Sequence, residues 1–160
     1  MLLLTTGTPS VVVLALHTRR QSQIANELCN VPPRAGDQIY VNDLMVRYDR
    51  AIHRTKVPDR KYNCHGLTFA TRRSSIVDPA EVQKILNDDG YQLVVEPNPV
   101  LPGDVALYRA DGDIEHTGIV VRADAKCIWI LSKWSCAQEV IHEPHYCPYK
   151  GVVSYFRIKP

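Results

Sequence analysis

The sequence has no apolar run that is long and unbroken enough to cross a membrane. Pro9 interrupts the apolar start of the chain, and the next apolar run covers only residues 11–16, whereas a membrane-spanning helix needs about 20 apolar residues. The start also lacks the basic residues of a signal peptide, and residues 17–20 (His-Thr-Arg-Arg) offer no small-residue cleavage site. We expect a strand or short helix there, and a protein that is cytoplasmic or exported by a dedicated secretion system.

The chain also lacks an excess of charge of either sign. Its formal net charge is +2 over 160 residues, and a nucleic-acid-binding protein needs a strongly basic face. We therefore expect no nucleic-acid partner. A hydrophobic content of 45% is ordinary for a soluble globular protein, and the length is enough for one domain with its own core.

No two cysteines have the C-x-x-C spacing of many zinc and redox sites. Their number is odd, so at least one thiol is free or pairs with another chain; the five are Cys29, Cys64, Cys127, Cys136 and Cys147. This favours free thiols in a reducing compartment, with a Cys136–Cys147 disulfide as the alternative in an exported chain. His142, His145 and Cys147 are zinc-ligand types without a compact fourth ligand. We expect a structural loop there, with no metal and no cofactor.

The stretch 62–70 places a cysteine at the predicted start of a helix. Asn63 is the expected N-cap, because its side chain can accept from free backbone N–H groups of the first turn. Those N–H groups and the helix dipole favour a thiolate at Cys64, and the thiolate is the nucleophilic form. Gly66 leaves space for a substrate backbone. The alternative is a small buried apolar residue at the start of a core helix.

A histidine follows on a predicted strand. Residues 101–108 read as a turn and a strand, and a polar hairpin at 110–113 leads into a second strand at 114–121. The alternation of a strand places His116 and Gly118 on one face. Gly118 is expected to leave room beside His116 for another element to pack closely, such as the helix that carries Cys64. A cysteine at a helix start and a histidine on a strand give the geometry that a thiol–imidazole pair needs.

The remaining pattern predicts an α+β fold. Apolar spacing favours a helix over 21–28, a short strand followed by a helix over 39–52, and a helix that starts at Asp78-Pro79. Strands are expected at 91–95, 126–134 and 152–158. The 11 prolines favour loops and short strands over a helix bundle. Helices therefore come first and a run of antiparallel strands follows.

Three pieces in this order resemble the NlpC/P60-like and CHAP cysteine hydrolases of the papain-like superfamily. They are residues 63–67 (Asn-Cys-His-Gly-Leu), 102–108 (Pro-Gly-Asp-Val-Ala-Leu-Tyr) and 116–120 (His-Thr-Gly-Ile-Val). The resemblance covers about the last hundred residues, and His65 stands where the family usually has a small residue. It implies a papain-like NlpC/P60-type fold, with N-terminal helices packed on an antiparallel sheet. We divide the chain into an N-terminal extension, 1–35, packed on a catalytic domain, 36–160.

The resemblance also implies a cysteine peptidase or amidase. Cys64 would attack an amide carbonyl and form an acyl-thioester, with His116 as the base and the Cys64 N–H as an oxyanion donor. A peptide or a peptidoglycan-like peptide is the implied substrate. A delivered toxin or effector, with an inhibitor or immunity protein as its partner, would fit a chain without a signal peptide. The alternatives are an acyltransferase or deamidase on the same fold, and a non-catalytic binding module.

The family places the residue that orients the histidine on the next strand, where Ser132 and Lys133 stand. A protonated lysine has no acceptor, so Ser132 is the expected third catalytic residue. Glu139 and His142 are acceptors beyond a predicted turn. We expect the loop after Trp134 to form a wall of the cleft together with Trp134 and Tyr149. The expected substrate-binding residues are Tyr62, Asn63, His65, Gly66 and Trp134.

Overall fold

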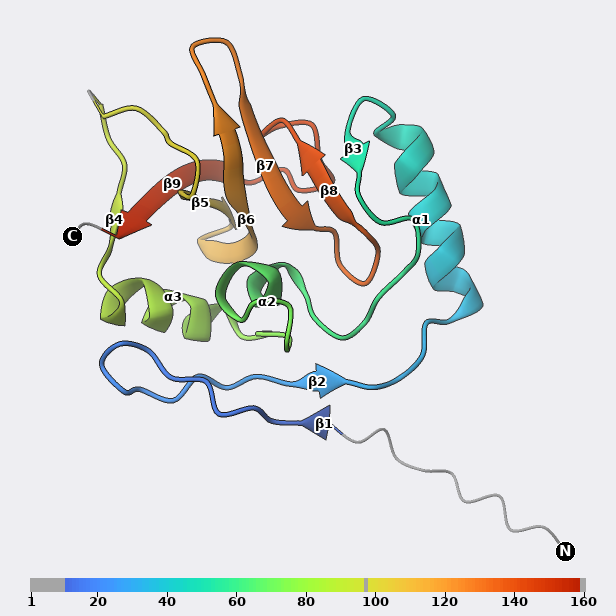
Figure 1. Ribbon diagram of the computed structural model, residues 1–160, viewed down its shortest axis with the longest axis horizontal. Helices are drawn as coiled ribbons and strands as arrows, with labels where there is room; N and C mark the ends of the chain where they lie inside the picture. Colours follow the sequence, from blue (N-terminus) through green and yellow to red (C-terminus); the bar gives the residue numbers. More distant parts are fainter. Residues whose placement is uncertain (1–10, 97, 159–160) are drawn as a thin grey trace, which may run out of the picture.

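A seven-stranded antiparallel sheet forms the centre of the molecule (Figure 1). The computed structural model describes residues 11–96 and 98–158. The strand order across the sheet is β3-β8-β7-β6-β5-β9-β4, so the strands of the predicted histidine hairpin, β5 and β6, lie inside it. The strands are β3 Ile52–His53, β4 Tyr91–Leu93, β5 Val105–Ala110, β6 Asp113–Ala123, β7 Ile128–Lys133, β8 Glu139–His142 and β9 Val152–Ile158.

Helices cover both faces of this sheet. They are α1 (Ala35–Arg47), α2 (Cys64–Phe69) and α3 (Pro79–Asp88). Val41 of α1 packs in one core cluster with Tyr108, whereas Val82 of α3 packs in another with Leu107. Because neighbouring residues of a strand point to opposite faces, α1 and α3 lie on opposite sides of β5. The fold is therefore α+β, as the sequence predicts.

Two predicted local signals are confirmed. The side chain of Asp78 accepts from the N–H of Ala80 at 2.8 Å, and Pro79 is the first residue of α3. At the β5–β6 turn, Asp111 and Gly112 have φ angles of 51° and 91°. A two-residue hairpin turn with positive φ at both positions matches the right-handed twist of the strands. Both features are determined by residues that lie close together in the sequence.

Two predicted elements are wrong. Residues 21–28 contain no helix; instead β2 (Leu28–Cys29) pairs with β1 (Val11–Val12), and a bridge joins His17 to Gln23. The strand expected near Ile39 is part of α1. Around 21–28 the apolar spacing is outweighed by strand pairing with earlier residues of the chain. Ile39 is 69% exposed within α1, so its apolar side chain does not mark a buried strand. The part of the N-terminal prediction that falls on residues 1–10 lies outside the described residues.

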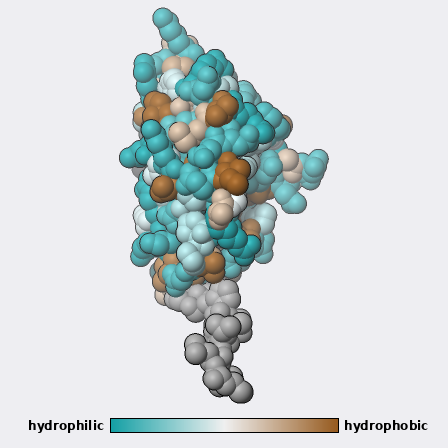
Figure 2. Space-filling view, turned by 90° about the vertical axis from the view of Figure 1, so that its right-hand side faces the viewer, coloured by the Kyte–Doolittle hydropathy of each residue, from teal (hydrophilic) through white to brown (hydrophobic). Residues whose placement is uncertain are grey.

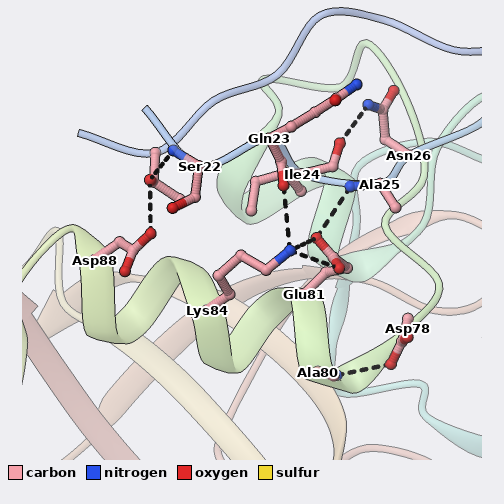
Figure 3. A network of polar contacts seen from close by, with 11 residues as sticks. Ser22, Gln23, Ile24, Ala25, Asn26, Asp78, Ala80, Glu81, Lys84 and Asp88 are labelled. Carbon is pink, nitrogen blue, oxygen red and sulfur yellow. Dashed lines mark hydrogen bonds and ion pairs between the residues drawn. The ribbon is translucent and has the colours of Figure 1, made fainter. Parts of the chain in front are cut away.

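Polar contacts attach the segment around Ile24 to α3 (Figure 3). The N–H of Ala25 donates to Glu81 Oε2 at 3.0 Å, and Lys84 Nζ donates to the carbonyl of Gln23 at 3.2 Å. Ile24 itself is only 2% exposed and packs in the same cluster as α3. The extended segment that precedes α1 is thus held on α3 by both apolar and polar contacts.

The face beside α1 is mostly hydrophilic (Figure 2). Apolar residues on this face are separated by hydrophilic ones. Ile39 and Val46 of α1 are 69% and 81% exposed. Apolar residues scattered singly on a surface are normal, so this face gives no indication of a partner. Among the described helices, none is long and apolar enough to cross a membrane.

The short helix α2 lies unusually close to the segment that follows it. A Cβ atom placed on Gly66 would come within 1.8 Å of the carbonyl oxygen of Ser74 and within 3.2 Å of the Cβ of Tyr62. The space that we expected a substrate backbone to use is therefore filled by the protein's own backbone. Only glycine permits this approach, which sets the position of α2.

We predict that Gly66→Ala destabilises the protein by about 1–3 kcal/mol, because the added methyl group forces α2 away from Ser74. Gly36→Ala is the matched control, since a Cβ at Gly36 in α1 meets no atom within 4 Å. This control should be neutral or slightly stabilising. Urea unfolding measures both. Equal free energies of unfolding for the two variants would contradict the close approach of α2.

Candidate active site around Cys64

Asn63 fixes the start of α2. Its Oδ1 atom accepts from the N–H of Gly66 at 2.8 Å and from the N–H of Ile76 at 3.2 Å. Its Nδ2 atom donates to the carbonyl of Ile76 at 2.6 Å. The predicted N-cap is therefore confirmed, and it also joins α2 to the next segment. All these bonds are within the protein, so the Asn63 side chain positions Cys64, the first residue of the helix.

The helix α2 packs on β6 through Thr117. The Thr117 hydroxyl lies 2.9 Å from His65 Nδ1 and donates to Thr68 Oγ1 at 3.1 Å. Because side chains alternate along a strand, His116 points to the other face. Gly118 does leave room for another element to pack closely, as expected, but that element is β7 and not α2: a Cβ on Gly118 would lie 2.5 Å from Ile130 Cγ2.

The sulfur of Cys64 nevertheless lies beside the backbone next to His116. Pairing between β6 and β7 ends at Gly118 and Ser132, so Thr117 has no partner on β7. The backbone N–H groups of Thr117, His65 and Cys64 itself act on the sulfur and lower its pKa. The Cys64 thiol therefore lies where the pairing of β6 with β7 ends, beside Thr117, the residue that follows His116 in β6.

Burial has the larger effect on the thiol. Cys64 is only 7% exposed, and burial raises the pKa of its thiol to about 11. This direction is opposite to the lowered pKa expected from the sequence, because loss of water outweighs the effect of the nearby N–H groups. The positive charge of Lys133 also lowers the Cys64 pKa. Lys133 is itself buried, and its Nζ donates to the carbonyl of Ala137 at 2.8 Å.

His116 is fully buried between aromatic rings. Its ring is stacked on that of Tyr149, with centroids 3.6 Å apart and planes at 11°, and meets Tyr108 edge-on at 5.3 Å. Neither ring nitrogen makes a hydrogen bond to any described residue, Cys64 included. Burial lowers the pKa of His116 well below its usual value, so the imidazole is neutral at neutral pH. Catalytic hydrogen bonds often form only with substrate bound.

Ser132, the expected orienting residue, contacts other side chains. Its Oγ accepts from Trp134 Nε1 at 3.1 Å and lies 2.8 Å from His142 Nε2. His142 Nδ1 lies 2.8 Å from the carbonyl of Glu143 and must donate to it, so Nε2 accepts the Ser132 proton. The structure does not bring Ser132 into hydrogen-bond contact with His116.

The expected substrate-binding side chains also have protein partners. The Tyr62 hydroxyl donates to Glu139 Oε1 at 2.7 Å, so it is not free to donate to an oxyanion. Trp134 is fully buried and meets Tyr48 edge-on at 5.0 Å. A pocket of about 240 Å³ does open beside the start of α2. Its lining residues are Glu27, Cys29, Arg60, Tyr62, Asn63, Ser75, Val77, Ser135 and Cys136.

All five cysteines are free thiols, so the alternative Cys136–Cys147 disulfide is not formed. Cys147 is buried and its Sγ lies 3.4 Å from the carbonyl oxygen of Tyr149. Across residues 11–96 and 98–158, no group of three or more His, Cys, Asp or Glu side chains is arranged to hold a metal ion. The loop that contains Cys147 is held by contacts within the protein.

Comparisons of this chain with protein-family models, with curated proteins and with solved structures found no match. The likeness to NlpC/P60-like and CHAP hydrolases therefore depends on the three motifs alone.

Three buried histidines predict that stability falls in mild acid. Burial lowers the pKa of His65 and of His142 to about 4, and it lowers the pKa of His116 as well. The pKa of a histidine in an unfolded chain is about 6.5. Between these values the unfolded chain binds more protons than the folded one. The free energy of unfolding should therefore fall as the pH drops from about 6.5 towards 4, and should lose this dependence above about 7.

Urea unfolding at a series of pH values tests this. His65→Gln should reduce the slope, because one proton-binding difference is removed. His145→Gln is the control, since His145 lies exposed on a loop, and it should keep the full slope. A free energy of unfolding that is constant between pH 5 and 7 would show that the buried histidines are not held neutral.

Proposed function

We propose that the protein is a cysteine hydrolase of the papain-like NlpC/P60 type that cleaves an amide bond. Cys64 is the nucleophile and His116 is the general base. The observation that carries the proposal is the position of the Cys64 sulfur beside the backbone N–H of Thr117, the residue next to His116. The order of the three motifs supports the same pairing of residues.

The protonation states of the two groups suit general-base catalysis. Burial keeps the Cys64 thiol protonated, with a pKa of about 11, and it keeps the His116 imidazole neutral. A neutral imidazole can accept the thiol proton while the sulfur attacks. Reactivity then comes from proton transfer in the transition state and does not require a thiolate in the resting enzyme.

The reaction balances with these residues and water. The Cys64 proton moves to His116 as the sulfur–carbon bond forms, and the carbonyl oxygen becomes an oxyanion. The N–H groups of Cys64 and His65, which already favour negative charge at the sulfur, are suitable oxyanion donors. His116 returns the proton to the leaving nitrogen as the carbon–nitrogen bond breaks. Water then attacks the thioester, loses a proton to His116, and releases the acid and the restored thiol.

Peptides are the substrate class that the proposal favours, and peptidoglycan peptides are the first to examine because of the motif resemblance. The pocket of about 240 Å³ is lined in part by Tyr62 and Asn63, the two residues that precede Cys64 in the chain. Its volume suits one small part of a substrate. Arg60 in its lining is paired with Asp37 at 2.6 Å, so this guanidinium is already neutralised.

We predict that Cys64→Ala and His116→Ala each abolish hydrolysis while the fold is kept. Residues that act as a unit in catalysis lose most of the activity when either is removed. The assay is release of new amino groups from peptidoglycan fragments and from a peptide library, with thermal melts as the fold control. Intact mass also detects an acyl adduct on Cys64. Cys127→Ala is the matched thiol control, since Cys127 is partly exposed and lies in the turn before β7.

Turnover by either Cys64→Ala or His116→Ala would contradict the proposed chemistry.

A further inference from the structure

None of the described residues makes a hydrogen bond that would orient the buried base of the proposed enzyme. Both ring nitrogens of His116 are buried and unpartnered among the described residues, and Ser132 is bonded to His142 instead. An imidazole base must be held so that one nitrogen faces the nucleophile. Some other contact must therefore fix the plane of the His116 ring.

We infer that Tyr149 is the positioning residue for His116, and that it acts by stacking on the imidazole face. This inference rests on the proposed function and deepens it. The two rings are nearly parallel, at 11°, with centroids 3.6 Å apart. Tyr108 meets the imidazole edge-on at 5.3 Å. Contacts on the face and at the edge together define the orientation of the ring.

The Tyr149 ring is itself held in place. Its hydroxyl accepts from the backbone N–H of Ser135 at 3.1 Å, directly after the fully buried Trp134. Near its backbone, Cys147 Sγ lies 3.4 Å from the Tyr149 carbonyl oxygen. Both ends of the residue are thus anchored, which a side chain on a freely moving loop would not be.

Stacking suits a base that must stay free to exchange a proton. The contact covers the face of the imidazole and leaves both ring nitrogens without a hydrogen bond to any described residue. When His116 takes the proton, the negative face of the tyrosine ring attracts the imidazolium. Tyr108 on β5, His142 on β8 and His65 on α2 are titratable side chains that act on or contact His116. None of these three is a carboxylate, and the stacked Tyr149 ring is placed to stabilise the imidazolium.

Alkylation of Cys64 by iodoacetamide gives a test that needs no substrate. The second-order rate constant is measured from pH 5 to 9 by peptide mass in wild type, His116→Ala and the Tyr149 variants. With His116 as base, the wild-type rate should form a plateau near neutral pH, about 100-fold above the His116→Ala rate at pH 6. The His116→Ala rate should instead rise steadily with the thiolate fraction.

Tyr149→Phe and Tyr149→Trp keep an aromatic face and should keep the plateau. Tyr149→Leu and Tyr149→Met remove the aromatic face, and the alkylation rate at their plateau should fall by roughly three- to tenfold. Two variants without an aromatic ring are made, so that the test can still be read from one of them if the other does not fold. Tyr146→Leu is the matched control, because Tyr146 is in the same loop but meets Tyr48 and contacts Asp49. The alkylation rate of Tyr146→Leu at the plateau should equal that of the wild type.

An unchanged plateau in the folded aliphatic variants, with His116→Ala still impaired, would overturn the role of Tyr149 and leave the proposed function intact. A wild-type profile equal to that of His116→Ala would overturn both. An equal loss in Tyr146→Leu would also overturn the inference, because the effect would then belong to the loop as a whole.

Discussion

Loss of water around one thiol and one imidazole is the constraint on which the chemistry of this site depends. Cys64 is 7% exposed and His116 is fully buried. Burial disfavours the charged form of each, so both are neutral when no substrate is bound. In the proposed mechanism the neutral thiol is a weak nucleophile at rest and becomes reactive only when its proton can pass to the imidazole. The same burial requires precise positions, since a buried group cannot exchange its proton through bulk water.

That precision comes from contacts around a helix of only six residues. Such a short helix is not stable by itself in water. Asn63 caps it and ties it to Ile76, Gly66 lets the Ser74 carbonyl approach, and the His65–Thr117 contact fixes it on β6. On the other face of β6, Tyr149 holds the imidazole by stacking. The proposed nucleophile and the proposed base are therefore positioned by different parts of the chain, from opposite sides of one strand.

The elements that the sequence predicted well depend on neighbouring residues. The caps at Asn63 and Asp78 and the turn at Asp111 involve chemistry within a few residues, which a sequence displays directly. The contacts that were missed join distant residues. Ser132 meets His142, and Tyr149 stacks on His116, because of strand pairing and a loop path that no local spacing reveals. The pKa of Cys64 was expected in the wrong direction, since a helix start is visible in a sequence and burial is not.

The most direct test of the Cys64–His116 pair is a crystal structure of the protein after reaction with a peptidyl vinyl sulfone. The proposed chemistry predicts a covalent bond to Cys64 Sγ, with one nitrogen of His116 within hydrogen-bond distance of the adduct and Tyr149 still on the imidazole face. An adduct on another cysteine would contradict it. So would an adduct on Cys64 with both His116 nitrogens facing away from the sulfur.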